Sequence, residues 1–202
     1  SAYANGYACF GELCSTALIH FNTPKLVVLH VKSKKRIIFI NQVTGYLFSD
    51  VVNAFAIEYD CTLFTGSIEK THVPIRNNVR VKKMIRYNRN VAVKRIFTWG
   101  IFTVQSFIKL LFHKKDTELF IVSNPPFAPF LGYFFHQVRG TKYHLLIYDV
   151  YPDVLVNFGV IKKNSLINRL WSRMNKKLFS KAETVFTLSK NMATLIKDYA
   201  PV

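Results

Sequence analysis

The sequence predicts an α/β fold in which a doubly wound parallel sheet of about six strands carries helices on both faces. Short runs of apolar and β-branched residues, typical of strands buried on both sides, recur from Arg36 onward. Longer stretches with apolar residues at helical spacing lie between these runs. No hairpin signal joins two consecutive runs. Regular alternation of strands and helices is the pattern of a Rossmann-like sheet.

The composition fits a folded domain with a strongly basic surface. Half of the 202 residues are hydrophobic, so the chain can bury a core and disorder is disfavoured. Lys and Arg number 28 against 11 Asp and Glu, which gives a formal net charge of +17. Such a surface either attracts phosphate, on nucleic acid, anionic lipid or a pyrophosphate ligand, or is simply a solvated basic face.

The cysteines and the apolar runs bear on the compartment. The odd set Cys9, Cys14 and Cys61 indicates reduced thiols in a reducing compartment, and no spacing among them fits a zinc site. No run reaches the roughly 18 apolar residues of a membrane-spanning helix, and no secretory signal pattern begins the chain. We therefore expect a cytoplasmic protein, with the inner face of the cytoplasmic membrane as its alternative position.

The expected elements follow in chain order after an N-terminal extension, residues 1–35, whose pattern differs from the rest. Within the extension, the apolar run Leu26–Val31 either adds an edge strand or lies in a poorly ordered segment. The predicted strands are Arg36–Asn41, Cys61–Thr65, Asn78–Tyr87, Leu119–Ser123, Tyr143–Asp149 and Thr184–Thr187. The predicted helices are 46–59, 93–113, 128–138 (ended by Gly140), 165–179 and a last helix, capped by Ser189, that reaches Tyr199.

In a doubly wound sheet, ligands bind beyond the carboxyl ends of the strands where the strand order reverses. This rule selects the loops 42–46, 124–127 and 149–153, together with Ser189. The first loop holds one glycine, Gly45, before Tyr46, so the three-glycine dinucleotide fingerprint is absent and a nicotinamide or flavin dehydrogenase is disfavoured. Gly45 either makes the turn or exposes backbone N–H groups to a polar ligand.

Asp149 is the candidate catalytic residue because it terminates a buried strand in a chain with few acids. Its carboxylate could hold a sugar hydroxyl or assist proton transfer. Tyr151 follows in the same loop, and Asn124 offers an amide side chain, unless its loop is only a rigid turn. Ser189 either caps a helix alone or also receives a polar group. The histidines show no metal-ligand spacing, and we expect no metal.

One predicted helix, 165–179, has a basic face. Arg169, Arg173, Lys176 and Lys177 share that face, beside an apolar stripe formed by Leu166, Leu170, Met174 and Leu178. Such a helix either packs on the sheet with a solvated basic face or lies against an anionic membrane. The basic segment Arg76–Arg95 and the apolar helix after it add weight to the membrane alternative, so both alternatives stay open.

Residues 36–202 resemble the N-terminal domain of GT-B glycosyltransferases, specifically the family 4 group that builds bacterial surface polysaccharides. The resemblance rests on the order of loosely matching motifs. They are Thr44-Gly45-Tyr46-Leu47-Phe48-Ser49-Asp50, Ser123-Asn124-Pro125-Pro126, Tyr148-Asp149-Val150-Tyr151-Pro152-Asp153 and the closing run from Ala182 to Met192.

The resemblance implies retaining transfer of a sugar from a nucleotide-sugar, as co-substrate and without a cofactor, to a lipid-linked or saccharide acceptor. In such enzymes the N-terminal domain holds the acceptor, and a C-terminal domain holds the nucleotide-sugar. The resemblance places Asp149 near the transferred sugar and Gly45 near the donor phosphates. Because the sequence stops at Val202, we expect the acceptor-side half of a GT-B fold, inactive as an isolated chain.

Two alternatives remain open at this point. The basic charge could mark a nucleic-acid-binding protein, although no RNA- or DNA-binding pattern appears and the aromatic residues lie in apolar runs. We therefore expect no specific nucleic acid partner. The third reading is a Rossmann-like module that binds a small molecule without catalysis.

Overall fold

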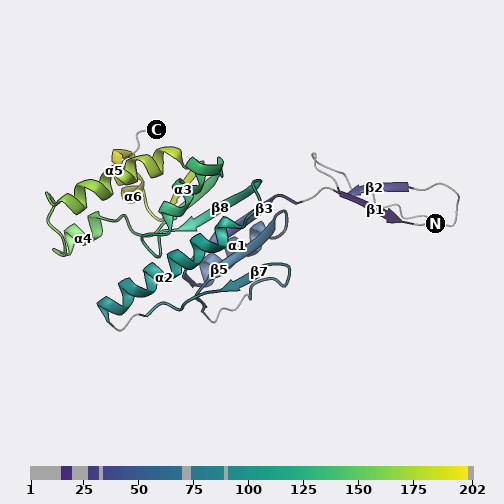
Figure 1. Cartoon of the computed structure of the whole chain (residues 1–202), viewed down its shortest axis with the longest axis horizontal. Helices are drawn as coiled ribbons and strands as arrows, with labels where there is room; N and C mark the ends of the chain where they lie inside the picture. The colour runs from purple at the N-terminus through teal and green to yellow at the C-terminus, as the bar shows by residue number, and fades with distance from the viewer. Residues whose placement is uncertain (1–14, 20–26, 32–33, 70–73, 89–90, 200–202) are drawn as a thin grey trace. The chain divides into compact units, whose positions relative to one another are not determined.

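The computed structural model describes residues 15–19, 27–31, 34–69, 74–88 and 91–199 (Figure 1). The chain forms two compact units, Ser1–Lys35 and Arg36–Val202. In the first unit, β1 (Ser15–Ile19) pairs antiparallel with β2 (Val27–Val31). The run ending at Val31 is therefore a strand, which belongs to a two-stranded sheet within this unit. The expectations for Cys9 and Cys14 lie outside the described residues.

The second unit is built on a six-stranded sheet in which every neighbouring pair is parallel. Its strands are β3 (Arg36–Ile40), β5 (Asp60–Thr65), β7 (Arg80–Lys83), β8 (Thr117–Val122), β9 (Tyr143–Ile147) and β10 (Thr184–Thr187). Their order is β10-β9-β8-β3-β5-β7, so the direction of winding reverses between β3 and β8. This order confirms the predicted doubly wound parallel sheet.

Helices cover both faces of this sheet, as predicted. They are α1 (Tyr46–Phe55), α2 (Ala92–Leu111), α3 (Pro129–Arg139), α4 (Asp153–Asn157), α5 (Leu166–Lys181) and α6 (Lys190–Tyr199). The core under α1 contains Ile37 and Phe39, whereas Ile38 and Ile40 pack in the core shared by α2, α3, α5 and α6. Alternate residues of the central strand β3 thus enter opposite cores, which explains its continuous apolar sequence.

Two predicted strands are shorter in the structure because their backbone groups bond elsewhere. The predicted strand 78–87 is regular only over β7, and beyond it the N–H of Ile85 donates to the Gln105 side chain of α2 (3.0 Å). The predicted strand 143–149 ends at Ile147, because the N–H groups of Tyr148 and Asp149 donate to the Ser123 hydroxyl oxygen.

A further pair of strands, β4 (Val43–Thr44) with β6 (Ser67–Ile68), has no counterpart in the sequence prediction. The predicted helix 46–59 ends at Phe55, after which the chain turns.

Glycine sets the path of the chain at Gly66 and at Gly140. At Gly66 a Cβ atom would stand 2.2 Å from the Ile85 carbonyl oxygen, so the close approach of these two backbone segments excludes a side chain. Gly140 ends α3 in the left-handed region, with φ of 67°, as its position predicted. The first glycine sets the path from β7 into α2, and the second sets the path from α3 into β9.

Tyr143 joins β9 to α5. Its ring is fully buried, and its hydroxyl donates to the Leu178 carbonyl (2.5 Å). Tyr143→Phe would leave that carbonyl unpaired, so we expect the free energy of unfolding to fall by about 1–3 kcal/mol. Denaturant titration measures the change. Tyr46→Phe, at an exposed tyrosine, serves as control and should change nothing; equal effects of the two variants would contradict the role of this hydrogen bond.

Candidate functional site at the carboxyl edge of the sheet

Gln42, just beyond β3, organises the carboxyl edge of the sheet and is fully buried. Its N–H donates to the Asn124 carbonyl (3.2 Å), and its own carbonyl accepts from Gly66 (3.0 Å). Its side-chain amide donates to the Thr98 carbonyl of α2 (3.1 Å). The loops after β3, β5 and β8 and the first half of α2 are therefore fixed to one another where the strand order reverses.

Ser123 fixes the loop that follows β9. Its hydroxyl oxygen accepts from the N–H groups of Tyr148 (2.9 Å) and Asp149 (3.4 Å). These bonds bend the chain out of the ladder. As a result Asp149 lies two residues past the end of β9, with an exposed side chain, and not at the last position of the strand as predicted.

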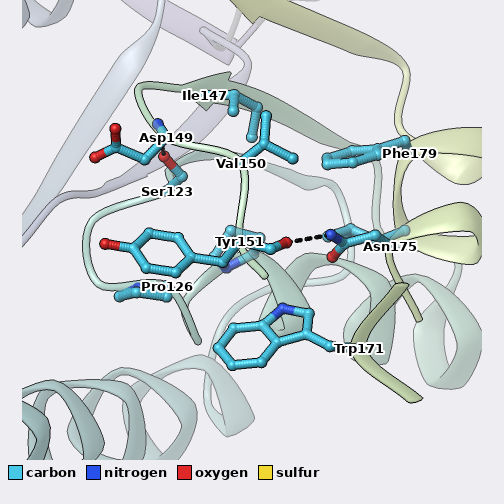
Figure 2. Close-up of a pocket in the computed structure, with 11 residues that line it drawn as sticks. Ser123, Pro126, Ile147, Asp149, Val150, Tyr151, Trp171, Asn175 and Phe179 are labelled. Carbon is cyan, nitrogen blue, oxygen red and sulfur yellow. Dashed lines mark hydrogen bonds between the residues drawn. The ribbon is translucent and has the colours of Figure 1, made fainter. Parts of the chain in front are cut away.

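Tyr151 is held from the other side by α5. The buried Asn175 donates its side-chain amide to the Tyr151 carbonyl oxygen (Figure 2). Both residues, with Ser123 and Asp149, line a small pocket that is partly open to solvent and has a cavity volume of about 20 Å³. Figure 2 shows the Asp149 carboxylate and the Tyr151 hydroxyl directed to the same side, away from Asn175.

Aromatic rings form a row through this region. Tyr151 stands between the two tryptophans of the chain, with ring centroids 6.4 Å from Trp99 on α2 and 6.0 Å from Trp171 on α5. The row continues to Tyr87 beyond Trp99 and to Phe127 beyond Trp171. All five side chains are partly exposed. The row thus presents flat apolar surfaces beside a carboxylate, an arrangement suited to a ligand with both apolar faces and hydroxyl groups.

The surroundings of Tyr151, burial above all, favour the protonated form of its hydroxyl. Burial raises the pKa of Tyr151, and the neighbouring Asp149 and Tyr87 raise it further, whereas Arg95 on the first turn of α2 opposes them. Burial also raises the pKa of Tyr148. The site therefore combines a carboxylate acceptor, phenol donors and a guanidinium group, which can bind hydroxyls or an anionic ligand but form no nucleophile–base pair.

The other four predicted site residues, Asn124, Gly45, Tyr46 and Ser189, lie in loops or at helix ends outside the pocket. Asn124 is partly exposed and adjoins Gln42 through its carbonyl. Gly45 begins α1, and a Cβ atom there would stand 3.3 Å from a carboxylate oxygen of Glu69; Tyr46 beside it is exposed. Ser189 accepts from the Met192 N–H (3.2 Å) as the predicted cap of α6, at the end of the edge strand β10. The described pocket brings together Asp149 and Tyr151, but none of these four.

On α5, the predicted basic face is exposed at Arg169, Arg173, Lys176 and Lys177. The apolar stripe beside it does not pack on the sheet as a whole. Leu178 is buried, whereas Leu166, Leu170 and Met174 are exposed. Arg89, within the basic segment before α2, lies outside the described residues.

Sequence reasoning missed the residues that hold the site in place. Ser123, Gln42 and Asn175 act through hydrogen bonds between segments far apart in the chain. Asn175 did carry a signal, because a polar residue one helical turn after Trp171 and before Leu178 lies on the buried face of an amphipathic helix. Trp99 and Tyr87 carried none, since only the packing of α2 brings Trp99 beside both Tyr151 and Tyr87.

Asn175→Leu would leave the Tyr151 carbonyl without its donor while keeping the branched shape and the number of heavy atoms of the side chain. We expect the free energy of unfolding to fall by about 1–3 kcal/mol and the environment of Trp171 to change. Chemical denaturation and tryptophan fluorescence measure the two effects. Lys176→Leu, at the exposed next position, should produce neither. An unchanged fluorescence spectrum in Asn175→Leu would show that this contact does not set the loop.

Tyr199 at the end of α6 donates its hydroxyl to the Asp153 carboxylate (2.6 Å), which begins α4. Burial and this bond raise the pKa of Tyr199 to about 12. A raised pKa in the folded state contributes stability that is complete below the unfolded value, about 10, and is lost as pH rises through about 12. We therefore expect the stability difference between wild type and Tyr199→Phe to shrink across that window.

Urea titrations at neutral pH and between about pH 10 and 12 measure this difference. The exposed Tyr46→Phe provides the control for general alkaline unfolding. A difference that stays constant through the window would show that the Tyr199 proton is not linked to folding.

The fold is that of a Rossmann-like α/β domain whose strand order reverses between β3 and β8. No family model matches the chain. It is 37% identical over 164 residues to the probable glycosyltransferase WbjE of Pseudomonas aeruginosa, a match that covers 77% of this chain and 40% of that relative's length. A UDP-N-acetylglucosamine 4-epimerase from Methanobrevibacter ruminantium M1, solved with UDP-N-acetylmuramic acid, superposes with a TM-score of 0.40 at 11% identity, covering 82% of each chain.

Among the described residues, no group of three or more His, Cys, Asp or Glu side chains is placed to hold a metal ion. Within the same residues, no helix has the length and apolarity needed to cross a bilayer.

Proposed function

We propose that this chain is the acceptor-binding part of a retaining glycosyltransferase of the GT-B type, which transfers a sugar from a nucleotide-sugar to a lipid-linked or saccharide acceptor. The observation that carries the proposal is the 37% identity to a probable glycosyltransferase over 77% of the chain. The retaining outcome and the GT-B assignment rest on the motif resemblance. Because the match spans 40% of the relative, we assign the nucleotide-sugar site to a region outside it, and expect the isolated chain to transfer no sugar.

The geometry supports a role for Asp149 at the reacting acceptor hydroxyl. Its exposed carboxylate points to the same side as the Tyr151 hydroxyl, so one group can accept a hydrogen bond and the other donate one. The rings of Trp99, Tyr151 and Trp171 offer apolar faces to the C–H surfaces of a sugar. Gly45, Tyr46, Asn124 and Ser189, on the loops around the same edge, complete the proposed substrate contacts.

The cations of α5 support contact with an anionic membrane surface, where a lipid-linked acceptor would reside. Arg169, Arg173, Lys176 and Lys177 are exposed, and the exposed Leu166, Leu170 and Met174 lie beside them. Mixed basic and apolar exposure of this kind is typical of helices that lie at a membrane interface. The proposed position of the protein is therefore the inner face of the cytoplasmic membrane.

The proposed acceptor site can be tested through its own fluorescence, because both tryptophans of the chain lie in the aromatic row. We expect a short-chain prenyl-diphosphate-linked N-acetylglucosamine to quench the emission saturably. Asp149→Asn should weaken this binding about tenfold, since it removes a charge-assisted hydrogen bond. Asp50→Asn, at an exposed acid on α1, is the matched control and should bind as wild type.

UDP-N-acetylglucosamine provides the opposing probe. Saturable quenching by the nucleotide-sugar, with none by the prenyl-linked sugar, would overturn the assignment of this chain to the acceptor. Trp99→Phe and Trp171→Phe each leave a single reporter, so the two variants locate the bound sugar along the row.

A further inference from the structure

The outward face of α2 is apolar along its whole length. Val93, Phe97, Val104, Ile108 and Leu111 follow one another at intervals of three, four or seven residues and therefore share one side of the helix. All five are exposed, Val93 at 75% and Phe97 at 66%. The opposite side, with Thr98, Phe102, Ser106 and Leu110, is buried against the sheet. This exposed row is thus separate from the part of α2 that forms the core.

Helix α3 extends the same surface. Phe134 and Val138, one turn apart, are exposed at 43% and 62%. The Phe134 ring lies 5.3 Å from that of Phe107 on α2, and the Arg139 guanidinium donates to the Leu111 carbonyl (2.8 Å). The two helices are therefore held together. We call the exposed residues Val93, Phe97, Val104, Ile108, Leu111, Phe134 and Val138 the α2–α3 apolar face.

This face departs from the pattern of a water-exposed helix. A surface helix of a soluble domain places polar and charged residues opposite its buried stripe, and a helix apolar all round is normally covered. In α2 the charged residues are confined to Lys94, Arg95 and Lys109, none of them in the exposed row. A contiguous exposed apolar surface rimmed by polar residues marks an interaction site.

The charged residues near the α2–α3 apolar face indicate which kind of partner it binds. Neither 91–115 nor 124–148 contains an Asp or Glu residue, whereas Lys94, Lys109, Lys114, Lys115 and Arg139 lie on the two helices or directly after α2. A second copy docked on this face would bring like charges together without an acid to pair them, which is unfavourable. An anionic lipid surface offers hydrocarbon for the apolar residues and phosphate for the cations.

We propose that the α2–α3 apolar face inserts into the headgroup region of an anionic membrane, with α2 lying parallel to the bilayer plane. Helices α2, α3 and α5 all pack on the same face of the sheet, so the cations of α5 belong to the same outer layer. This inference rests on the membrane contact proposed above for α5 and adds the inserted part. The basic helix attracts the anionic surface, and the apolar face anchors the protein to it.

Flotation of the full chain with vesicles of phosphatidylcholine, with and without phosphatidylglycerol, tests the inference. We expect wild type to float with the anionic vesicles. The double variant Phe97→Glu and Val104→Glu should lower the vesicle-bound to free ratio about tenfold or more, because it replaces two inserted side chains by charges. Leu47→Glu with Ile57→Glu, at exposed apolar positions in the α1 region on the opposite side of the sheet, should float as wild type.

The remaining variants separate this inference from the α5 contact. Arg169→Glu with Arg173→Glu should weaken flotation in low salt, as the α5 proposal requires. If that pair weakens flotation while Phe97→Glu with Val104→Glu does not, the α5 contact stands and the inserted face is refuted. Phe97→Ala with Val104→Ala removes the apolar groups without adding charge, and wild-type flotation of a folded alanine pair would also refute it. A dimer in sedimentation that the glutamate pair dissociates, without vesicle binding by wild type, would assign the face to a second copy.

Discussion

A single buried side chain and its backbone, at Gln42, hold the carboxyl edge of the sheet together. Parallel strands end at this edge with backbone groups that no further ladder satisfies, so each needs another partner. Gln42 supplies several: it bonds to Asn124 after β8, to Gly66 after β5, and to Thr98 on α2. These bonds join the loops after β3, β5 and β8 to one another and to α2.

The rest of the site depends on this frame. Fixing Thr98 places the next residue, Trp99, beside Tyr151, which approaches from the end of β9. Ser123 and Asn175 then hold the Asp149–Tyr151 loop from β8 and α5. Each contact joins segments that the sheet topology brings to the same edge. The strand order therefore brings the aromatic rings into one row. The exposed Asp149 carboxylate lies beside that row because β9 ends just before it.

The basic surface and the apolar surface have different consequences. A net charge of +17 gives long-range attraction to any polyanion, which salt weakens and which selects no particular partner. The apolar side chains on α2 and α3 act only at contact and are not screened by salt. In the membrane contact proposed above, the α5 cations supply the attraction and the α2–α3 apolar face supplies the anchoring. Free nucleic acid offers phosphate but no hydrocarbon, so it would engage only the cations.

The sequence by itself determined the fold class, because buried strands and amphipathic helices carry periodic apolar patterns that need no knowledge of their neighbours. It also located Asp149 and Tyr151, since polar residues directly after a buried strand must lie at the sheet edge. It misjudged where β7 and β9 end, because Gln105 and Ser123, far away in the chain, compete for their backbone groups. Only the tertiary structure decided that Trp99 meets Tyr151, that Asn175 holds the loop, and that the apolar outer side of α2 stays uncovered by any described residue. These features depend on the packing of segments that are far apart in the sequence. A local pattern of residue types predicts which face of a helix is apolar, but it does not predict what packs against that face.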